Sequence, residues 1–129
     1  VRGYQLDDKE IPFHTTYKSL FDRHSLMQGK VTFDLPERWL QNKDKLKLST
    51  PLNFASTADT IGGNSGSPVL NREGELIGVN FDRNRHGLVR NFVYTDVQAR
   101  HIAVHTQGIL EALRNIYQAE DLIKEMAGQ

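Results

Sequence analysis

Hydrophobic and polar residues alternate over two short stretches near the middle of the chain, and this pattern predicts β-strands. Residues 46–49 alternate as a half-buried strand would, and residues 52–56 repeat the pattern after Pro51. Later apolar, β-branched and aromatic runs predict three further strands, at residues 69–70, 76–81 and 91–95. Residues 102–104 fit either one more strand or the start of a following helix, and their periodicity does not separate the two.

The hydrophobic spacing changes to a helical period near the end of the chain. Apolar residues lie on one helical face from Thr106 onward, and the stripe continues to Met126, so we expect a terminal helix over about residues 106–127. Strands followed by such a helix predict a mainly β fold, a small barrel with the helix packed on its outside.

Two shorter helices are predicted in the first third of the chain. Thr15 and Thr16 precede residues 17–21, and one of these threonines could cap a first short helix. Asp34 could cap a second helix over residues 36–44, which would bury Trp39 and Leu40 on one side.

Composition excludes several classes of function. Sixteen basic and sixteen acidic residues among 129 cancel, so we expect neither nucleic acid nor an anionic membrane surface as a partner. No apolar run approaches the roughly 20 residues that span a bilayer, which argues against membrane insertion. The chain has no cysteine, which excludes a thiolate nucleophile, a zinc-thiolate site and disulfides. We expect no metal ion and no organic cofactor.

The segment with the clearest chemistry is Gly62-Gly63-Asn64-Ser65-Gly66-Ser67-Pro68. A serine among small, turn-forming residues suits an exposed nucleophile, and an attacking serine needs backbone N–H donors for the oxyanion that forms. Gly63 and Ser65 could supply those donors, and the glycines of the segment allow the positive φ angles that such a turn requires. The same residue types also build ordinary turns, so a plain structural turn is the alternative.

This segment and its surroundings resemble the bacterial serine dipeptidyl-peptidases of the dipeptidyl-peptidase 7 and 11 family. The similar stretches occur in the family's order: Thr50-Pro51-Leu52-Asn53-Phe54, Asp59-Thr60-Ile61 through Val69, Gly74-Glu75-Leu76-Ile77-Gly78, and Asn80-Phe81-Asp82-Arg83-Asn84. The resemblance implies a chymotrypsin-like (trypsin-like) double barrel with an inserted helical domain. Residues 1–129 would then be the C-terminal β-barrel portion, with a short helix before it and the terminal helix after it, and the N-terminal barrel would be absent.

The resemblance also implies roles for three residues. Ser65 is the expected nucleophile, the Gly63 amide the expected oxyanion donor, and Arg83 the expected contact of an acidic side chain, because family members that prefer Asp or Glu carry Arg at this position. A guanidinium at the bottom of a pocket suits a carboxylate for two reasons. Its N–H donors form a rigid fork that matches the two carboxylate oxygens, and the group stays positively charged at any physiological pH. The alternative for Arg83 is a solvated charge at the end of a strand, with no contact to substrate.

The implied activity is removal of dipeptides from peptide amino termini, with Asp or Glu before the scissile bond. The family's setting implies the periplasm or the cell surface, and a homodimer. By the same resemblance, the catalytic histidine and aspartate, and the residues that bind the substrate's free amino terminus, lie outside this segment. His14 and His24 are the only histidines before Ser65 and are interpreted as structural, so we expect the isolated segment to hydrolyse peptides poorly or not at all.

Two other functions remain open. A glutamyl endopeptidase of the staphylococcal type has the same nucleophile segment and also prefers acidic residues, although the run from Asn80 to Asn84 and the terminal helix fit it less well. A non-catalytic binding domain that retains a protease barrel is the other alternative, because a fold does not fix a function.

Overall fold

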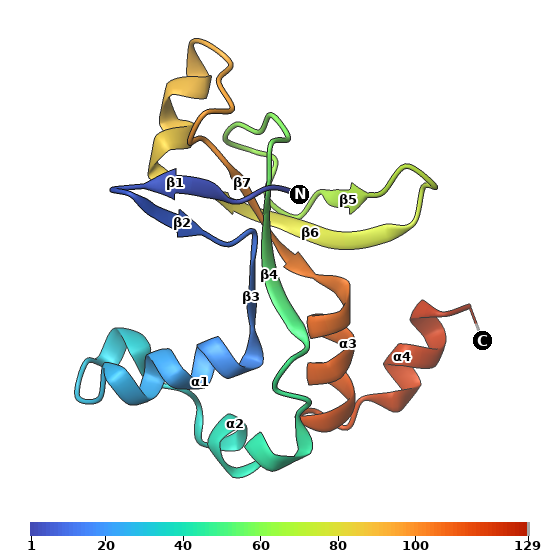
Figure 1. Ribbon diagram of the computed structural model, residues 1–129. Helices are drawn as coiled ribbons and strands as arrows, with labels where there is room; N and C mark the ends of the chain where they lie inside the picture. The colour runs from blue at the N-terminus through green and yellow to red at the C-terminus, as the bar shows by residue number, and fades with distance from the viewer. Residues whose placement is uncertain (129) are drawn as a thin grey trace.

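The computed structural model describes residues 1–128, which form two antiparallel sheets (Figure 1). A hairpin near the N-terminus pairs β1 (Tyr4–Leu6) with β2 (Lys9–Ile11). The larger sheet has the strand order β3-β4-β7-β6-β5. Its strands are β3 (His14–Thr16), β4 (Pro51–Ser56), β5 (Pro68–Leu70), β6 (Leu76–Arg83) and β7 (His101–His105).

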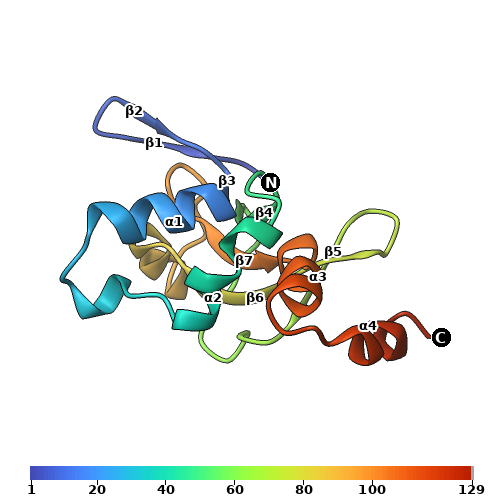
Figure 2. The same cartoon turned by 90° about the horizontal axis from the view of Figure 1, so that it is seen from below.

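The α-helices gather at one end of this sheet. Figure 1 shows α1, α2 and α3 below the strands, and Figure 2, a view from below, shows α4 projecting away beyond α3. The α-helices are α1 (Tyr17–Leu26), α2 (Glu37–Gln41), α3 (Thr106–Asn115) and α4 (Glu120–Met126), and the 3-10 helices are η1 (Val31–Phe33), η2 (Lys43–Lys45) and η3 (Arg85–Asn91). None of the helices described within residues 1–128 is both long enough and apolar enough to cross a bilayer.

The predicted threonine cap is confirmed, and of the two candidates it is Thr16 that caps α1. Thr16 Oγ1 accepts a hydrogen bond from the Ser19 amide, and Ser19 Oγ accepts one from the Thr16 amide, so both ends of a capping box are present. The helix that follows places Tyr17 and Phe21 in a buried cluster with Leu46 and Ile116. This cluster fixes the helices against one another at the end of the sheet.

Two predicted strands are absent from the structure. Residues 46–49 do not alternate across a sheet, because Leu46 is drawn into the helical cluster and a turn follows, closed by a hydrogen bond of 2.9 Å from the Thr50 amide to the Lys47 carbonyl. Residues 91–95 begin at the last residue of η3 and continue as a loop in which Phe92 and Val93 are 88% and 65% exposed. Their β-branched and aromatic residues do not form a strand here, because no neighbouring strand pairs with them.

The helix predictions are partly corrected. Asp34 does not cap the second helix, because α2 begins only at Glu37, after Pro36, and no side chain accepts a hydrogen bond from its first turn. Trp39 is half-buried as expected, but Leu40 remains exposed.

The C-terminal helix is interrupted, and residues 102–104 lie in a strand. The predicted helix over 106–127 is divided into α3 and α4, because Gln118 adopts a left-handed backbone with a φ of 55°. The Ala119 amide then bonds back to the Leu113 carbonyl at 2.9 Å, which ends α3. Residues 102–104 belong to β7, where they pair with both β4 and β6.

The prediction of a mainly β barrel is corrected by the sheet topology. Helical residues outnumber strand residues, and β3 and β5 lie at opposite edges of an open five-stranded sheet. Closure of a barrel requires the edge strands to meet, and residues 1–128 do not bring them together. The antiparallel sheet with helices before and after it is therefore the part of the predicted architecture that the structure confirms.

Arg100 ties the N-terminal hairpin to the larger sheet. Its side chain is only 1% exposed, and its guanidinium donates to the backbone carbonyls of Arg2, Gly3, Asp96 and Ala99 at 2.6–3.1 Å. These bonds join the start of the chain to the segment that leads into β7. A residue that satisfies so many carbonyls cannot be removed without leaving buried acceptors unpaired.

We expect Arg100→Met to lower the free energy of unfolding by about 2–4 kcal/mol, because the stem is retained while the buried carbonyls lose their donors. Thermal and denaturant unfolding of the 129-residue chain measure the effect. The matched control is Arg72→Met, at an exposed position in the turn before β6. Equal stability of the two variants would contradict the structural role of Arg100.

Candidate active site

The turn that carries Ser65 has the backbone that its glycines predict. Gly63 and Gly66 adopt positive φ angles of 95° and 87°, which other residues rarely reach. The Asn64 side chain accepts a hydrogen bond of 2.8 Å from the Ile61 amide, and the Asn64 carbonyl accepts one from the Ser67 amide. Ser65 is thereby held at the exposed tip of an ordered turn.

Asn80 fastens this turn to strand β6. Its buried side chain donates to the Asn64 carbonyl at 2.7 Å, and its backbone bonds to the amide of Gly66 and the carbonyl of Ser67 at 2.8 and 2.9 Å. Three bonds from one buried residue fix the position of the turn relative to the strand. Sequence reasoning missed this residue because a single asparagine in an apolar run gives no signal of such a role.

The groups around Ser65 suit a nucleophile. Ser65 Oγ donates to the Phe81 carbonyl at 3.4 Å, a long bond that leaves the hydroxyl easily displaced. Neither the Gly63 amide nor the Ser65 amide donates a hydrogen bond to any other residue in the 1–128 range. Two unengaged N–H groups beside an exposed hydroxyl fit an oxyanion hole, and the roles of Ser65 and Gly63 stay predictions.

The histidines lie elsewhere. In residues 1–128, no histidine nitrogen is hydrogen-bonded to Ser65 Oγ. His24 Nδ1 donates to the Phe33 carbonyl, His101 Nδ1 is bonded to Ser56 Oγ at 2.8 Å, and His105 Nδ1 accepts from the Gln107 amide. No histidine of residues 1–128 is thus hydrogen-bonded to Ser65 as a general base would be.

Among the described residues, the Arg83 guanidinium bonds only to neutral acceptors. Its Nη1 donates to the Thr60 carbonyl at 3.3 Å and to Asn91 Oδ1 at 2.9 Å, and both acceptors are neutral. Among the described residues it forms no ion pair. A half-buried guanidinium without a counter-charge is a favourable site for an incoming carboxylate.

Ser65 and Arg83 line the same small pocket, of about 130 Å³. Typical small-molecule pockets are about 300–1,000 Å³, so this one has room for a single side chain. Its lining residues are Thr60, Ile61, Gly62, Ser65, Asn80, Phe81, Asp82 and Arg83. Asp82, which sequence reasoning did not single out, is the acidic member of this set.

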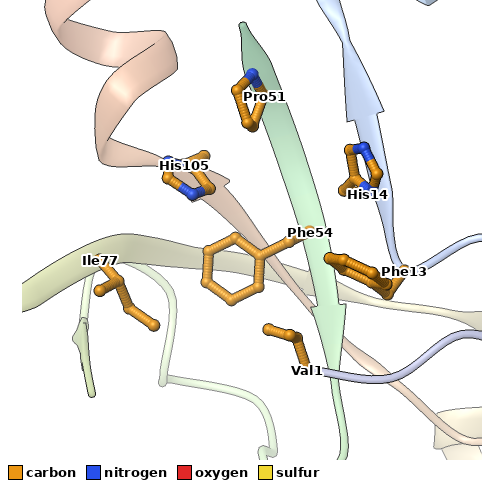
Figure 3. A pocket seen from close by; sticks show the side chains of 7 residues that line it. All are labelled: Val1, Phe13, His14, Pro51, Phe54, Ile77 and His105. Atoms are coloured by element: carbon orange, nitrogen blue, oxygen red, sulfur yellow. The ribbon is translucent and has the colours of Figure 1, made fainter.

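A larger, apolar cavity of about 290 Å³ lies on the sheet and contains neither Ser65 nor Arg83. Figure 3 shows the ring of Phe54 in its middle, with Ile77 on one side and Phe13 and His14 on the other. His105 also lines it, and burial, followed by the nearby His14, lowers the pKa of His105 below its usual value. Across residues 1–128, no group of three potential metal ligands occurs in this cavity or elsewhere.

An exposed serine on a glycine-containing turn, beside a pocket for one side chain, is compatible with a peptidase. The chain matches the peptidase S46 family over residues 1–128, and it belongs to that family.

The relatives with curated names are dipeptidyl-peptidases. An Asp/Glu-specific dipeptidyl-peptidase of Porphyromonas endodontalis is 42% identical to the chain and matches all of it, with 19% of the relative's length covered. An Asp/Glu-specific dipeptidyl-peptidase of Capnocytophaga gingivalis is 35% identical over 88% of this chain and 17% of its own length. The chain thus spans about a fifth of the length of these relatives.

Solved structures show the same backbone arrangement. P. endodontalis DPP11 in complex with the dipeptide Arg-Asp superposes with a TM-score of 0.85 at 28% identity, over 97% of this chain and 19% of that protein. The complex with Arg-Glu gives a TM-score of 0.87 over 98% of this chain and 19% of that protein. The fold of residues 1–128 is therefore one that occurs inside a larger peptidase.

The lowered pKa values of buried His101 and half-buried His105 predict that stability depends on pH. Burial is the main cause that lowers the pKa of His101, with the charge of Arg90 second, and the pKa of His105 is lowered as well. In the unfolded chain the histidine pKa values are about 6.5, so the unfolded chain binds more protons than the folded chain as the pH falls.

We expect the free energy of unfolding to decrease as the pH falls from about 7.5 to 5.5, above the range in which carboxylates titrate. His105→Asn should reduce this dependence, since asparagine is a good cap for α3 and does not titrate. Urea unfolding at several pH values measures both slopes. A flat profile in the original chain, or an unchanged slope in the variant, would contradict the expectation.

Proposed function

We propose that this chain is the nucleophile-bearing portion of a serine-type peptidase that releases dipeptides from peptide amino termini, with Asp or Glu before the scissile bond. The observation that carries the proposal is the shared pocket of Ser65 and Arg83, in which the guanidinium lacks a carboxylate partner among the described residues. The names of the Asp/Glu-specific relatives support the same substrate class.

In the proposed reaction, Ser65 Oγ attacks the carbonyl carbon of the second substrate residue and gives its proton to a histidine base. The amides of Gly63 and Ser65 stabilise the oxyanion. Collapse of the tetrahedral intermediate breaks the C–N bond, and the histidine returns the proton to the departing amine. Water then hydrolyses the acyl-enzyme and releases the dipeptide.

The base and its carboxylate partner would come from an N-terminal barrel outside residues 1–129. The open sheet would then form part of a chymotrypsin-like C-terminal barrel, completed by chain that is not in this sequence. On this proposal the purified 129-residue chain hydrolyses peptides poorly or not at all, because no histidine in the described range reaches Ser65. A periplasmic or cell-surface setting and a homodimer complete the proposal by family resemblance.

Two substitutions in the protein at its full natural length test the proposed roles. Ser65→Ala should lower kcat/KM by more than about 1,000-fold on every substrate, because the nucleophile is lost. Arg83→Gly should lower it by about 100-fold on free-amino dipeptidyl amides ending in Asp or Glu, and by less than about threefold on those ending in Leu. Hydrolysis of the three amides measures both effects.

The matched control is Arg72→Gly, which removes an exposed arginine outside the pocket and should leave all three rates unchanged. Full activity of both Ser65→Ala and Arg83→Gly would mean that the chemistry occurs elsewhere. It would then favour a non-catalytic role for this domain.

Removal of dipeptides requires recognition of the substrate's free amino group. Asp82 lines the same pocket as Ser65, and its exposed carboxylate could pair with an ammonium group. This position inside the chain differs from the expectation that such residues lie outside it. An endopeptidase, in contrast, has no need of this pairing.

We expect acetylation of the substrate's amino group to lower kcat/KM by at least about 100-fold, and Asp82→Asn to lower it by about tenfold or more on free-amino substrates only. Paired assays of free and acetylated peptides measure both. Equal hydrolysis of the two peptides would instead support the glutamyl endopeptidase alternative.

A further inference from the structure

Arg83 is held along its whole length, by η3, which follows it in the sequence, and by Thr60, which precedes Ser65. Its stem lies against buried Gly87, where an added Cβ would stand only 3.2–3.4 Å from the Arg83 side-chain carbons. At the other end, Nη1 donates to the Thr60 carbonyl and to the Asn91 side chain. The direction of the guanidinium is thus set by residues of η3 and of the segment before Ser65.

Both neutral acceptors engage the same nitrogen. Among residues 1–128, neither Nε nor Nη2 of Arg83 donates a hydrogen bond. This leaves one edge of the guanidinium, Nε with Nη2, for a two-point bond to a carboxylate. The two bonds to Nη1 thus orient the Arg83 guanidinium and leave Nε and Nη2 open for a substrate carboxylate.

The chemistry of Asn91 matters as much as its position. An amide oxygen accepts a hydrogen bond and carries no net charge, whereas a carboxylate in the same place would pair with the guanidinium and neutralise it. Asn91 Oδ1 makes the shorter of the two bonds to Nη1, at 2.9 Å against 3.3 Å for Thr60. The bond to Asn91 is therefore the stronger of the two contacts that orient Arg83. It is also the one that a substitution can remove, because the bond to Thr60 goes to the backbone.

Asn91 is itself fixed by its neighbour. Arg90 is buried and donates to the carbonyls of Ala58, Thr95 and Ala99, which fastens the end of η3 to the chain on both sides. At its start, η3 is capped by the Asn84 side chain, which accepts from the Gly87 amide. Asn91 is consequently presented by a short helix that is held at both ends.

We propose that Asn91 is a positioning residue for acidic-substrate specificity: it aims the Arg83 guanidinium at the side chain before the scissile bond without placing a carboxylate on that guanidinium. The proposal rests on the proposed function, because it requires Arg83 to bind the substrate carboxylate. It acts through Arg83 and involves no contact of Asn91 with substrate.

The test measures the ratio of kcat/KM for a Glu-ending over a Leu-ending dipeptidyl amide, with the protein at its full natural length. Asn91→Asp, nearly identical in shape, should lower the ratio at least tenfold, because it neutralises Arg83. Asn91→Ala should lower it about three- to tenfold through a higher KM for the Glu substrate. The rate on the Leu substrate should stay within about twofold in both variants, which excludes a general loss of folding.

The control for added charge is Gln107→Glu, at an exposed position on α3, and it should leave the ratio unchanged. A second control repeats Asn91→Asp in an Arg83→Gly background, where the proposal predicts no further change. A large additional loss there would overturn it, since Asn91 would then act independently of Arg83.

The outcomes separate this inference from the proposed function. If Arg83→Gly abolishes the preference for Glu while Asn91→Asp preserves it, only the role of Asn91 is overturned. If Arg83→Gly leaves the preference intact, both the proposed pocket and the role of Asn91 are overturned. If Arg83→Gly and Asn91→Asp each abolish the preference for Glu, and the double variant loses no more than Arg83→Gly alone, both the proposed pocket and the role of Asn91 are supported.

Discussion

Burial of Asn80 in β6 is the constraint on which the candidate site depends. Its side chain and backbone hold the turn that carries Ser65, and the next residues of the same strand line the pocket and end at Arg83. β6 in turn pairs with β7, with an irregular register between Asn80 and Asp82. Since Asn80 bonds the Ser65 turn to β6 and Arg83 ends the same strand, the relative position of Ser65 and Arg83 is set by this one strand of the sheet.

The arginines around this strand show how a chain of zero net charge can still carry local positive charge that no ion pair within residues 1–128 cancels. Arg90 and Arg100 are buried, and the bonds that their guanidinium groups make go to backbone carbonyls; Arg83 bonds to a carbonyl and an amide oxygen. Such acceptors satisfy N–H donors without cancelling their charge. Among the described residues, none of the three arginines forms an ion pair. The local positive charge is thus a property of the packing, which overall composition cannot reveal.

Sequence reasoning succeeded where a local pattern determined the structure. The Thr16 cap, the central strands β4 and β6, and the positive φ angles of Gly63 and Gly66 follow from nearest neighbours along the chain. It failed where distant packing decided, as in the strand predicted at residues 91–95, whose first residue instead ends η3 and bonds to Arg83. Ser65 and Arg83 could be singled out from the sequence, but the contacts that orient them could not, because Asn80 and Asn91 act through the tertiary fold.

The most direct measurement is a crystal structure of the protein at its full natural length with a dipeptide ending in Glu. The account predicts the Glu side chain in the pocket beside Arg83, bonded to Nε and Nη2, with the dipeptide's terminal carbonyl carbon next to Ser65 Oγ and its oxygen facing the Gly63 amide. Binding in the apolar cavity around Phe54, or at Arg83 with Ser65 remote from the carbonyl, would contradict it.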